Sequence, residues 1–252
     1  MKTYIYAPKY QQNSGGVKVL YKLNEVLKSL GLDCDILNFG EELENKNSVV
    51  IYPEIVSGNP LKAKHVIRWV LYYPSINGGD KVYDDNEHIF TYSNLYLSSI
   101  KNSIKGKVYL NTVEPYYVDL NKKRRGICFY TGKGYRPDVI GDTWLEITRS
   151  YPANRERLAE IFQRSIAFVC YDPNTVMTLE ATLCGCPVVV PPNLFDRYKI
   201  SEYGQNGICD SFLKLDIAAN TLGKVRLIHE ELNTKSIIEC KMLKEYIEGL
   251  YE

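Results

Sequence analysis

The chain has 252 residues, of which 45% are hydrophobic and 24% charged, with 31 Lys and Arg against 30 Asp and Glu. This composition is typical of a globular protein and excludes disorder, and the balanced charge argues against nucleic acid as a partner. The longest unbroken apolar run, residues 166–171, is too short to cross a bilayer, and the N-terminus lacks the apolar stretch of a signal peptide. We therefore expect a cytoplasmic protein.

The first half of the chain alternates between strand and helix patterns. Leucines and valines repeat every three or four residues over 17–30 and predict a helix that ends at Gly31. Short apolar runs predict strands at 3–7, 34–37, 48–52, 65–73, 90–92 and 107–110. Strands separated by helical stretches predict a parallel sheet with helices on both faces.

After the charged segment 121–126 the same alternation starts again. Strands are predicted at 127–130, 145–148, 166–171 and 187–190, helices at 154–164 and 175–183, and a mostly helical segment at 217–251. The fold class is therefore α/β, with two Rossmann-like parallel-sheet domains at residues 1–120 and 121–252. Their strand carboxyl ends are expected to face a central cleft, where ligands usually bind.

The seven cysteines are an odd number and suit a reducing compartment better than a disulfide framework. Cys184 and Cys186 form the one close pair in the sequence, and the chain has only three histidines. A metal site would need further ligands at matching spacing. We therefore interpret the pair as small buried residues at a turn, and we expect no metal or other cofactor.

Residues 171–190 are the most informative segment. They predict a strand, a loop, a helix from Thr175 that contains Glu180, and a Gly-Cys-Pro turn into the next strand. Free N–H groups at a helix N-terminus favour an anion. A buried carboxylate needs hydrogen-bond donors, which two sugar hydroxyls would supply. The plainer alternative is a helix-capping Asp and a structural Glu.

Residues 172–188 contain an acidic residue, seven further residues, Glu-Ala and then Gly-x-Pro-Val. This pattern resembles the E-x7-E signature of retaining GT-B glycosyltransferases of the family 4 type. The resemblance implies that Glu180 binds the nucleotide ribose and that Asp172 faces the donor sugar. Asp172 stands where the family usually has Glu, so its side chain is one methylene shorter. Asn174 and Thr175 would lie on the donor side of this loop.

The resemblance extends to the loop after the strand at 127–130. There it implies that Lys133 and Arg136 contact the donor diphosphate, while Gly132 and Gly134 let the main chain approach it. A surface turn is the alternative. In the first half, Gly15 and Gly16 are similar to the family's N-terminal glycine loop near acceptor and donor phosphate. His65 and His88 are interpreted as structural.

The resemblance implies a metal-independent transferase in surface polysaccharide biosynthesis. It would move a sugar, with retention, from a nucleotide-diphosphate donor to a hydroxyl of a glycan or lipid-linked glycan. Two alternatives remain: a nucleotide-sugar epimerase of the same fold, and a non-catalytic module that binds nucleotide or glycan. The basic residues 122–125 fit either a solvated linker or peripheral contact with anionic lipid at the inner face of a membrane.

Overall fold

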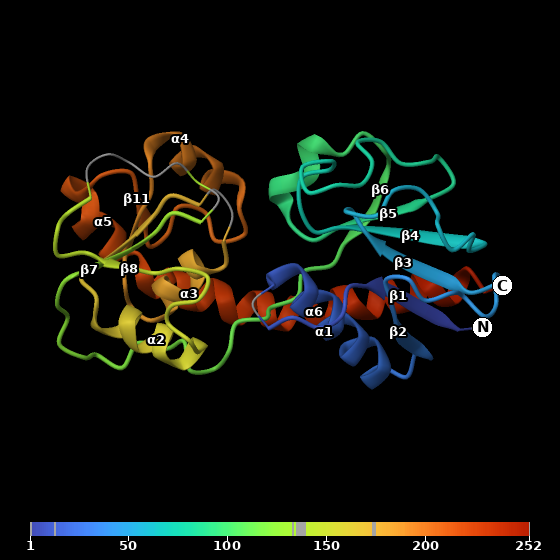
Figure 1. Cartoon of the computed structure of the whole chain (residues 1–252), viewed down its shortest axis with the longest axis horizontal. Coiled ribbons are helices and arrows are strands. Elements are labelled where there is room, and N and C mark those ends of the chain that lie inside the picture. The colour runs from blue at the N-terminus through green and yellow to red at the C-terminus, as the bar shows by residue number, and fades with distance from the viewer. Residues whose placement is uncertain (1, 13, 133, 135–139, 173–174, 252) are drawn as a thin grey trace. The chain divides into compact units, whose positions relative to one another are not determined.

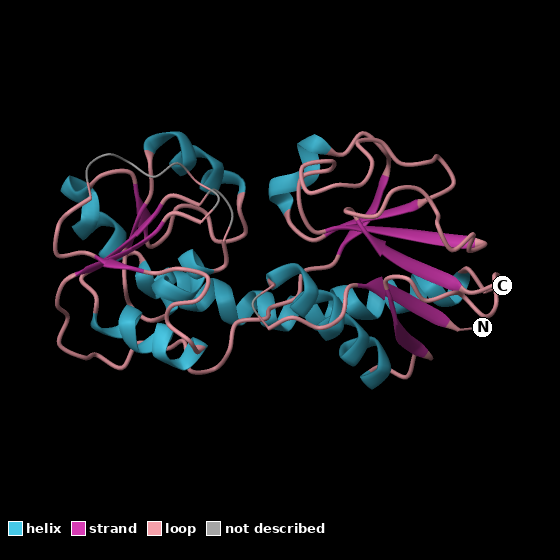
Figure 2. Ribbon diagram, in the orientation of Figure 1, coloured by secondary structure: helices cyan, strands magenta, loops and turns pink. Residues whose placement is uncertain are grey.

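The computed structural model of the protein describes residues 2–12, 14–132, 134, 140–172 and 175–251 (Figure 1). The chain divides into two compact units. Unit 1 consists of Met1–Thr112 and Glu231–Glu252, and unit 2 consists of Val113–Glu230. Each unit contains one parallel sheet, so the predicted α/β class with two Rossmann-like sheets is confirmed (Figure 2).

Unit 1 is built on a six-stranded sheet in the order β2-β1-β3-β4-β5-β6. Its strands are β1 (Thr3–Ala7), β2 (Cys34–Asn38), β3 (Val49–Pro53), β4 (His65–Val70), β5 (His88–Thr91) and β6 (Ile104–Lys107). Most of these bounds match the predicted strands, but β6 begins and ends three residues early. The apolar run behind that prediction is buried after the strand, where the Trp69 indole N–H donates to the Val108 carbonyl oxygen over 3.2 Å.

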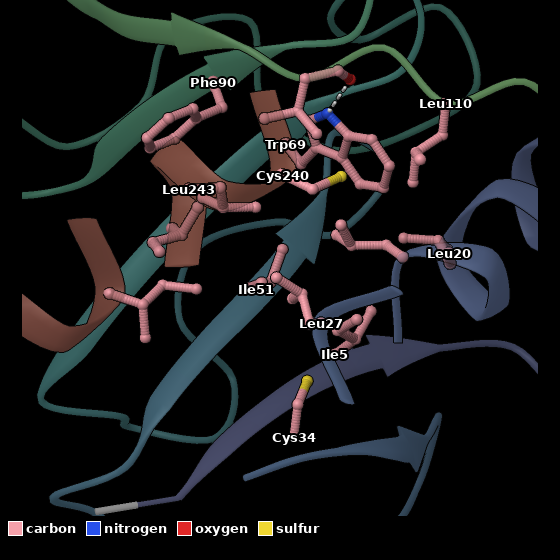
Figure 3. Packing of buried hydrophobic residues seen from close by; sticks show 14 of the residues in the cluster. Ile5, Leu20, Leu27, Cys34, Ile51, Trp69, Phe90, Leu110, Cys240 and Leu243 are labelled. Atoms are coloured by element: carbon pink, nitrogen blue, oxygen red, sulfur yellow. Dashed lines mark hydrogen bonds between the residues drawn. The ribbon is translucent and has the colours of Figure 1, made fainter. Parts of the chain in front are cut away.

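The α-helices of unit 1 cover one face of its sheet. Helix α1 (Gly15–Ser29) buries its leucines against Ile5 and Ile51, and the end of helix α6 (Leu222–Gly249) adds Cys240 and Leu243 to the same core (Figure 3). The other face is packed by loop side chains such as Val56 and Ala63 and by the 3₁₀ helix η1 (Asn94–Ser99). The prediction of helices on both faces is met only in part in this unit: among the described residues the second face carries the 3₁₀ helix η1 and loops but no α-helix, because the connections 54–64 and 71–87 are rich in Pro, Gly, Asn and Asp.

Unit 2 has a five-stranded parallel sheet in the order β11-β10-β9-β7-β8. Its strands are β7 (Ile127–Tyr130), β8 (Leu145–Glu146), β9 (Ala167–Cys170), β10 (Val188–Val189) and β11 (Ile208–Cys209). Its helical elements are α2 (Arg155–Arg164), α3 (Met177–Leu183), α4 (Pro192–Phe195), η2 (Asp196–Ile200), η3 (Phe212–Lys214) and α5 (Leu215–Asn220). Strand β11 and helix α4 were not predicted, because both are too short to show a period.

The two sheets begin with the same strand order. In each, the first strand lies between the second and the third, so the direction of strand addition reverses between β1 and β3 and between β7 and β9. In open parallel sheets, ligands bind outside the carboxyl ends of the strands at such a switch point. The topology therefore singles out the loops after these four strands.

The unit boundaries differ from the predicted domains at both ends. Residues 113–120 belong to unit 2, whose core includes Tyr117, and residues 231–252 belong to unit 1. The second difference arises because Cys240, Leu243 and Ile247 of α6 are buried in the core of unit 1. The Tyr109 N–H also donates to Glu239 Oε2 over 2.7 Å. Among the described residues, no helix combines the length and apolar character needed to cross a membrane.

Candidate functional site

The switch point of unit 2 brings together two of the segments singled out in the sequence. Strands β7 and β9 are paired, and just past their ends the Tyr171 N–H donates to the Tyr130 carbonyl oxygen over 2.9 Å. The loop that starts at Thr131 and the loop that starts at Tyr171 therefore leave the sheet side by side. The sheet topology, rather than nearness in sequence, makes them neighbours.

Gly132 and Gly134 hold the first of these loops against the second. Gly132 has a φ of +52°, and a Cβ atom there would lie 2.1 Å from Asp172 Oδ2. A Cβ atom at Gly134 would lie 1.8 Å from the Tyr171 carbonyl oxygen. No side chain fits at either position. Glycine is thus required at both positions by the protein's own close packing, whether or not a phosphate binds there.

Asp172 is 5% exposed although it follows a strand at the sheet edge where open parallel sheets usually bind ligands. The ring of Tyr130 and the main chain of Gly132 lie beside it. Burial raises the pKa of the Tyr130 hydroxyl, and the nearby Asp172 carboxylate raises it further. The Asp172 carboxylate therefore lies in a partly dehydrated environment, where electrostatic interactions are stronger than in water.

Glu180 lies on α3 and is 2% exposed. Its two carboxylate oxygens both contact Nη2 of Arg155, the first residue of α2, with 2.6 Å to Oε2. Burial disfavours the charge of Arg155, but the attraction of Glu180 outweighs it, so the pKa of Arg155 is raised. Arg155 keeps 24% of its side chain exposed, and this ion pair therefore connects a buried carboxylate to the surface.

Tyr117 completes the surroundings of this pair. The Arg155 guanidinium lies 5.7 Å from the centre of the Tyr117 ring, a cation–π distance. Tyr117 is 4% exposed, and within the described part of the chain its hydroxyl has no hydrogen-bond partner. Burial, followed by the charge of Glu180, raises the pKa of this hydroxyl. An unpaired buried hydroxyl costs about 1–3 kcal/mol.

Thr175 does not begin a helix as predicted. Helix α3 starts at Met177, and Thr175 Oγ1 accepts a hydrogen bond from the Met177 N–H over 3.3 Å. One of the free N–H groups expected to attract an anion is therefore already paired. Three other predicted residues, Lys133, Arg136 and Asn174, lie outside the described residues.

Gly15 and Gly16 lie in unit 1, at the start of α1 and past the end of β1. Both are exposed, and a Cβ atom at either position would meet nothing within 4 Å. Ser14 caps the helix by accepting from the Val17 N–H over 3.5 Å. Unlike Gly132 and Gly134, these glycines are not required by packing within the described chain.

Two of the basic residues 122–125 form hydrogen bonds and an ion pair within unit 2. Arg124 donates to the carbonyl oxygens of Phe162 and Cys184 and pairs with Asp119 at 3.0 Å. Lys122 donates to Gln163 Oε1 over 2.8 Å. A solvated linker does not describe these two residues, because both hold the chain against unit 2.

The histidines and cysteines take part in packing. His88 Nδ1 lies 2.8 Å from the Tyr246 hydroxyl, and Cys184 and Cys186 are fully buried. Burial raises the pKa of the Cys184 thiol to about 12, so the thiol stays protonated at neutral pH. Within the described ranges, no three His, Cys, Asp or Glu side chains form a group that could hold a metal ion.

Sequence reasoning found Asp172 and Glu180 but missed Arg155 and Tyr117. The Asn154 cap and the helix after it were predictable, and they place Arg155 in the first turn of α2. Its pairing with a residue of α3 depends on how the two helices pack, which no local pattern records. No protein-family model matches the chain, and a search of curated proteins finds no significant match.

Proposed function

We propose that the protein is a glycosyltransferase of the GT-B type that uses a nucleotide-diphosphate sugar as donor and retains the anomeric configuration. One observation carries the proposal: at the switch point of unit 2, a glycine loop closes onto the buried Asp172, with Asp172 and Glu180 spaced as in the resembled signature. The acceptor is proposed to be a hydroxyl of a glycan or lipid-linked glycan.

In this proposal each segment has a separate task. The loop at 131–136 binds the diphosphate, with Lys133 and Arg136 neutralising the charge that develops as the bond to the sugar breaks. Asp172 faces the sugar. Glu180 accepts hydrogen bonds from the ribose hydroxyls. Gly15 and Gly16 belong to the acceptor and phosphate loop of unit 1. No metal is needed for these steps.

The Arg155–Glu180 pair adds a condition to ribose binding. A carboxylate offers about four lone-pair positions, and Arg155 approaches through a single nitrogen, Nη2. The ribose hydroxyls therefore share Glu180 with Arg155 instead of meeting a bare carboxylate.

A nucleotide screen tests the proposal. UDP, GDP, CMP, ADP and TDP are each added in the presence of EDTA while the melting temperature is measured. A nucleotide at about 100 times its Kd stabilises by roughly 2.7 kcal/mol, enough for a shift of several degrees. One diphosphate that stabilises the wild type and loses about tenfold in affinity in Glu180→Gln supports the ribose role. The exposed Glu245→Gln variant is the control and should bind like the wild type.

A second candidate function is a non-catalytic module that binds nucleotide or glycan. The observation that favours it is the ion pair itself, since both oxygens of Glu180 already have a partner inside the protein. Release of free sugar from the nucleotide sugar without acceptor distinguishes the two. Slow hydrolysis that is lost in Asp172→Asn supports the transferase, whereas tight nucleotide binding without any turnover supports the module.

A further inference from the structure

A pocket of about 230 Å³ lies at the amino end of the unit 2 sheet, the end opposite the candidate site. Ile127 and Leu145, the first residues of β7 and β8, form part of its wall, and the other walls come from α2 and from the segment before β7. Because parallel strands all begin at the same edge, this pocket and the loops after β7 and β9 are separated by the length of the strands.

Three exposed arginines are among the residues that line this pocket, Arg125, Arg157 and Arg164. Arg157 is paired with Glu160, which also lines the pocket, so the lining carries a net charge of +2. Within the described part of the chain, Arg125 and Arg164 form no ion pair. The Arg125 N–H donates to the Arg164 carbonyl oxygen over 2.6 Å, which keeps the two residues adjacent.

The end of α2 would ordinarily weaken such a site, because carbonyl groups at a helix C-terminus attract cations and repel anions. Here Arg124 donates to the carbonyl oxygens of Phe162 and Ser165, which removes much of that effect. Arg125 and Arg164 are exposed, and the apolar part of the lining comes from Ile127, Leu145 and Ile161.

We propose that this pocket binds a small phosphorylated anion through Arg125 and Arg164, with Thr143 as a further hydrogen-bonding group. Guanidinium groups match phosphate oxygens in charge and in geometry. The volume lies below the ~300–1,000 Å³ of pockets that enclose drug-sized ligands, which suits a phosphate with little attached to it. The site is independent of the proposed transferase chemistry.

Inorganic phosphate is the first probe. Phosphorus NMR of a phosphate titration, at constant ionic strength, is expected to show saturable binding to the wild type. Arg125→Gln and Arg164→Gln should each weaken it about tenfold, while Arg164→Lys should keep part of it. Arg197→Gln is the matched control, because it removes one exposed arginine of unit 2 away from the pocket. Amide proton dispersion confirms that each variant is folded.

Vesicles then identify the source of the phosphate. Sedimentation with vesicles of phosphatidylcholine and phosphatidic acid in equal parts, displaced by free phosphate, would identify a lipid headgroup. Binding of free phosphate without sedimentation would identify a soluble ligand. The proposal is overturned if the phosphorus signal does not respond, or if Arg125→Gln, Arg164→Gln and Arg197→Gln weaken binding equally.

Discussion

Unit 1 and unit 2 begin with the same strand order, and in both an acidic residue follows the third strand of that order. Glu54 follows β3 and is 4% exposed, and Asp172 follows β9 and is 5% exposed. In both units a glycine packs closely against the acidic residue. A Cβ atom at Gly79 would lie 1.8 Å from the Glu54 carbonyl oxygen, and a Cβ atom at Gly132 would lie 2.1 Å from Asp172 Oδ2.

The difference lies in which loop approaches and what it touches. Gly79 belongs to the loop after β4 and contacts main chain, while Glu54 Oε2 accepts from the Leu71 N–H over 3.0 Å, so Glu54 ties two strand ends together. Gly132 belongs to the loop after β7, across the switch point, and contacts the carboxylate of Asp172 itself. A buried acid at a strand end is therefore not enough to indicate a site; the approach of the switch-point loop is the distinguishing feature.

Each unit has an Arg–Glu ion pair with a buried carboxylate, Arg68–Glu87 in unit 1 and Arg155–Glu180 in unit 2. Breaking the first pair gives the largest predicted loss in the free energy of unfolding. Arg68 is fully buried and contacts Glu87 through Nε at 2.8 Å and Nη2 at 2.9 Å. Its remaining donors reach carbonyl oxygens of the segment after β3. Glu87→Ala leaves this charge buried without a partner, and we expect a loss of about 3–5 kcal/mol in urea unfolding.

Glu180→Ala in unit 2 is the matched variant. Arg155 retains 24% side-chain exposure and can recover water, so the expected loss is at most about half that of Glu87→Ala. The exposed pair of Lys22 and Glu25 is the control, and Glu25→Ala should cost less than about 0.5 kcal/mol. Equal losses for Glu87→Ala and Glu180→Ala would remove the distinction between a fully buried pair and one whose arginine reaches water.

The glycines of the two switch-point loops give a second, smaller effect. Gly134→Ala places a methyl group on the Tyr171 carbonyl oxygen, so the loop must move, at an expected cost of about 1–3 kcal/mol. Gly16→Ala meets nothing within 4 Å and lies in the first turn of α1, so it should be neutral or stabilise by up to about 1 kcal/mol. Thermal unfolding measures both, and a loss in Gly16→Ala similar to that in Gly134→Ala would contradict the comparison.

Much of this arrangement could be predicted from sequence because it depends on local pattern. Strands β1 and β7 match their predicted bounds, and the leucine period identified α1, since alternating buried runs and a helical face are properties of short segments. The sequence did not predict the return of the end of α6 to unit 1. Nothing in the period of Cys240, Leu243 and Ile247 says which sheet they will cover.

The candidate site likewise has features that could be predicted from the sequence and features that could not. Asp172, Glu180 and the glycines after β7 were singled out by their resemblance to a family signature, and the structure places the loops after β7 and β9 side by side. The pairing of Glu180 with Arg155 and the contact of Gly132 with Asp172 are long-range packing results, which spacing cannot encode. The glycines were predicted to make room for phosphate; what the structure shows is that they make room for the protein's own backbone and carboxylate.

The smallest predicted effect concerns Glu54. It tests whether Glu54, of the two buried acidic residues compared above, Glu54 and Asp172, is the one with a structural role. Burial raises the pKa of Glu54, so between its unfolded and folded pKa values the folded state binds more protons than the unfolded state. The contribution of Glu54 to stability is therefore full at pH values below the unfolded pKa and falls as the pH rises through the folded pKa. Gln cannot ionise and keeps an oxygen that can accept from Leu71.

The stability of Glu54→Gln relative to wild type should accordingly improve from about pH 4 to pH 8, as urea unfolding at several pH values would show. Taking the difference between the two proteins cancels the titration of all other groups that the substitution leaves unchanged. The exposed Glu42→Gln variant is the control for loss of a carboxylate as such. A difference between Glu54→Gln and wild type that stays flat with pH would mean that Glu54 is not dehydrated as its burial implies, and the contrast with Asp172 would then rest on the glycine loops alone.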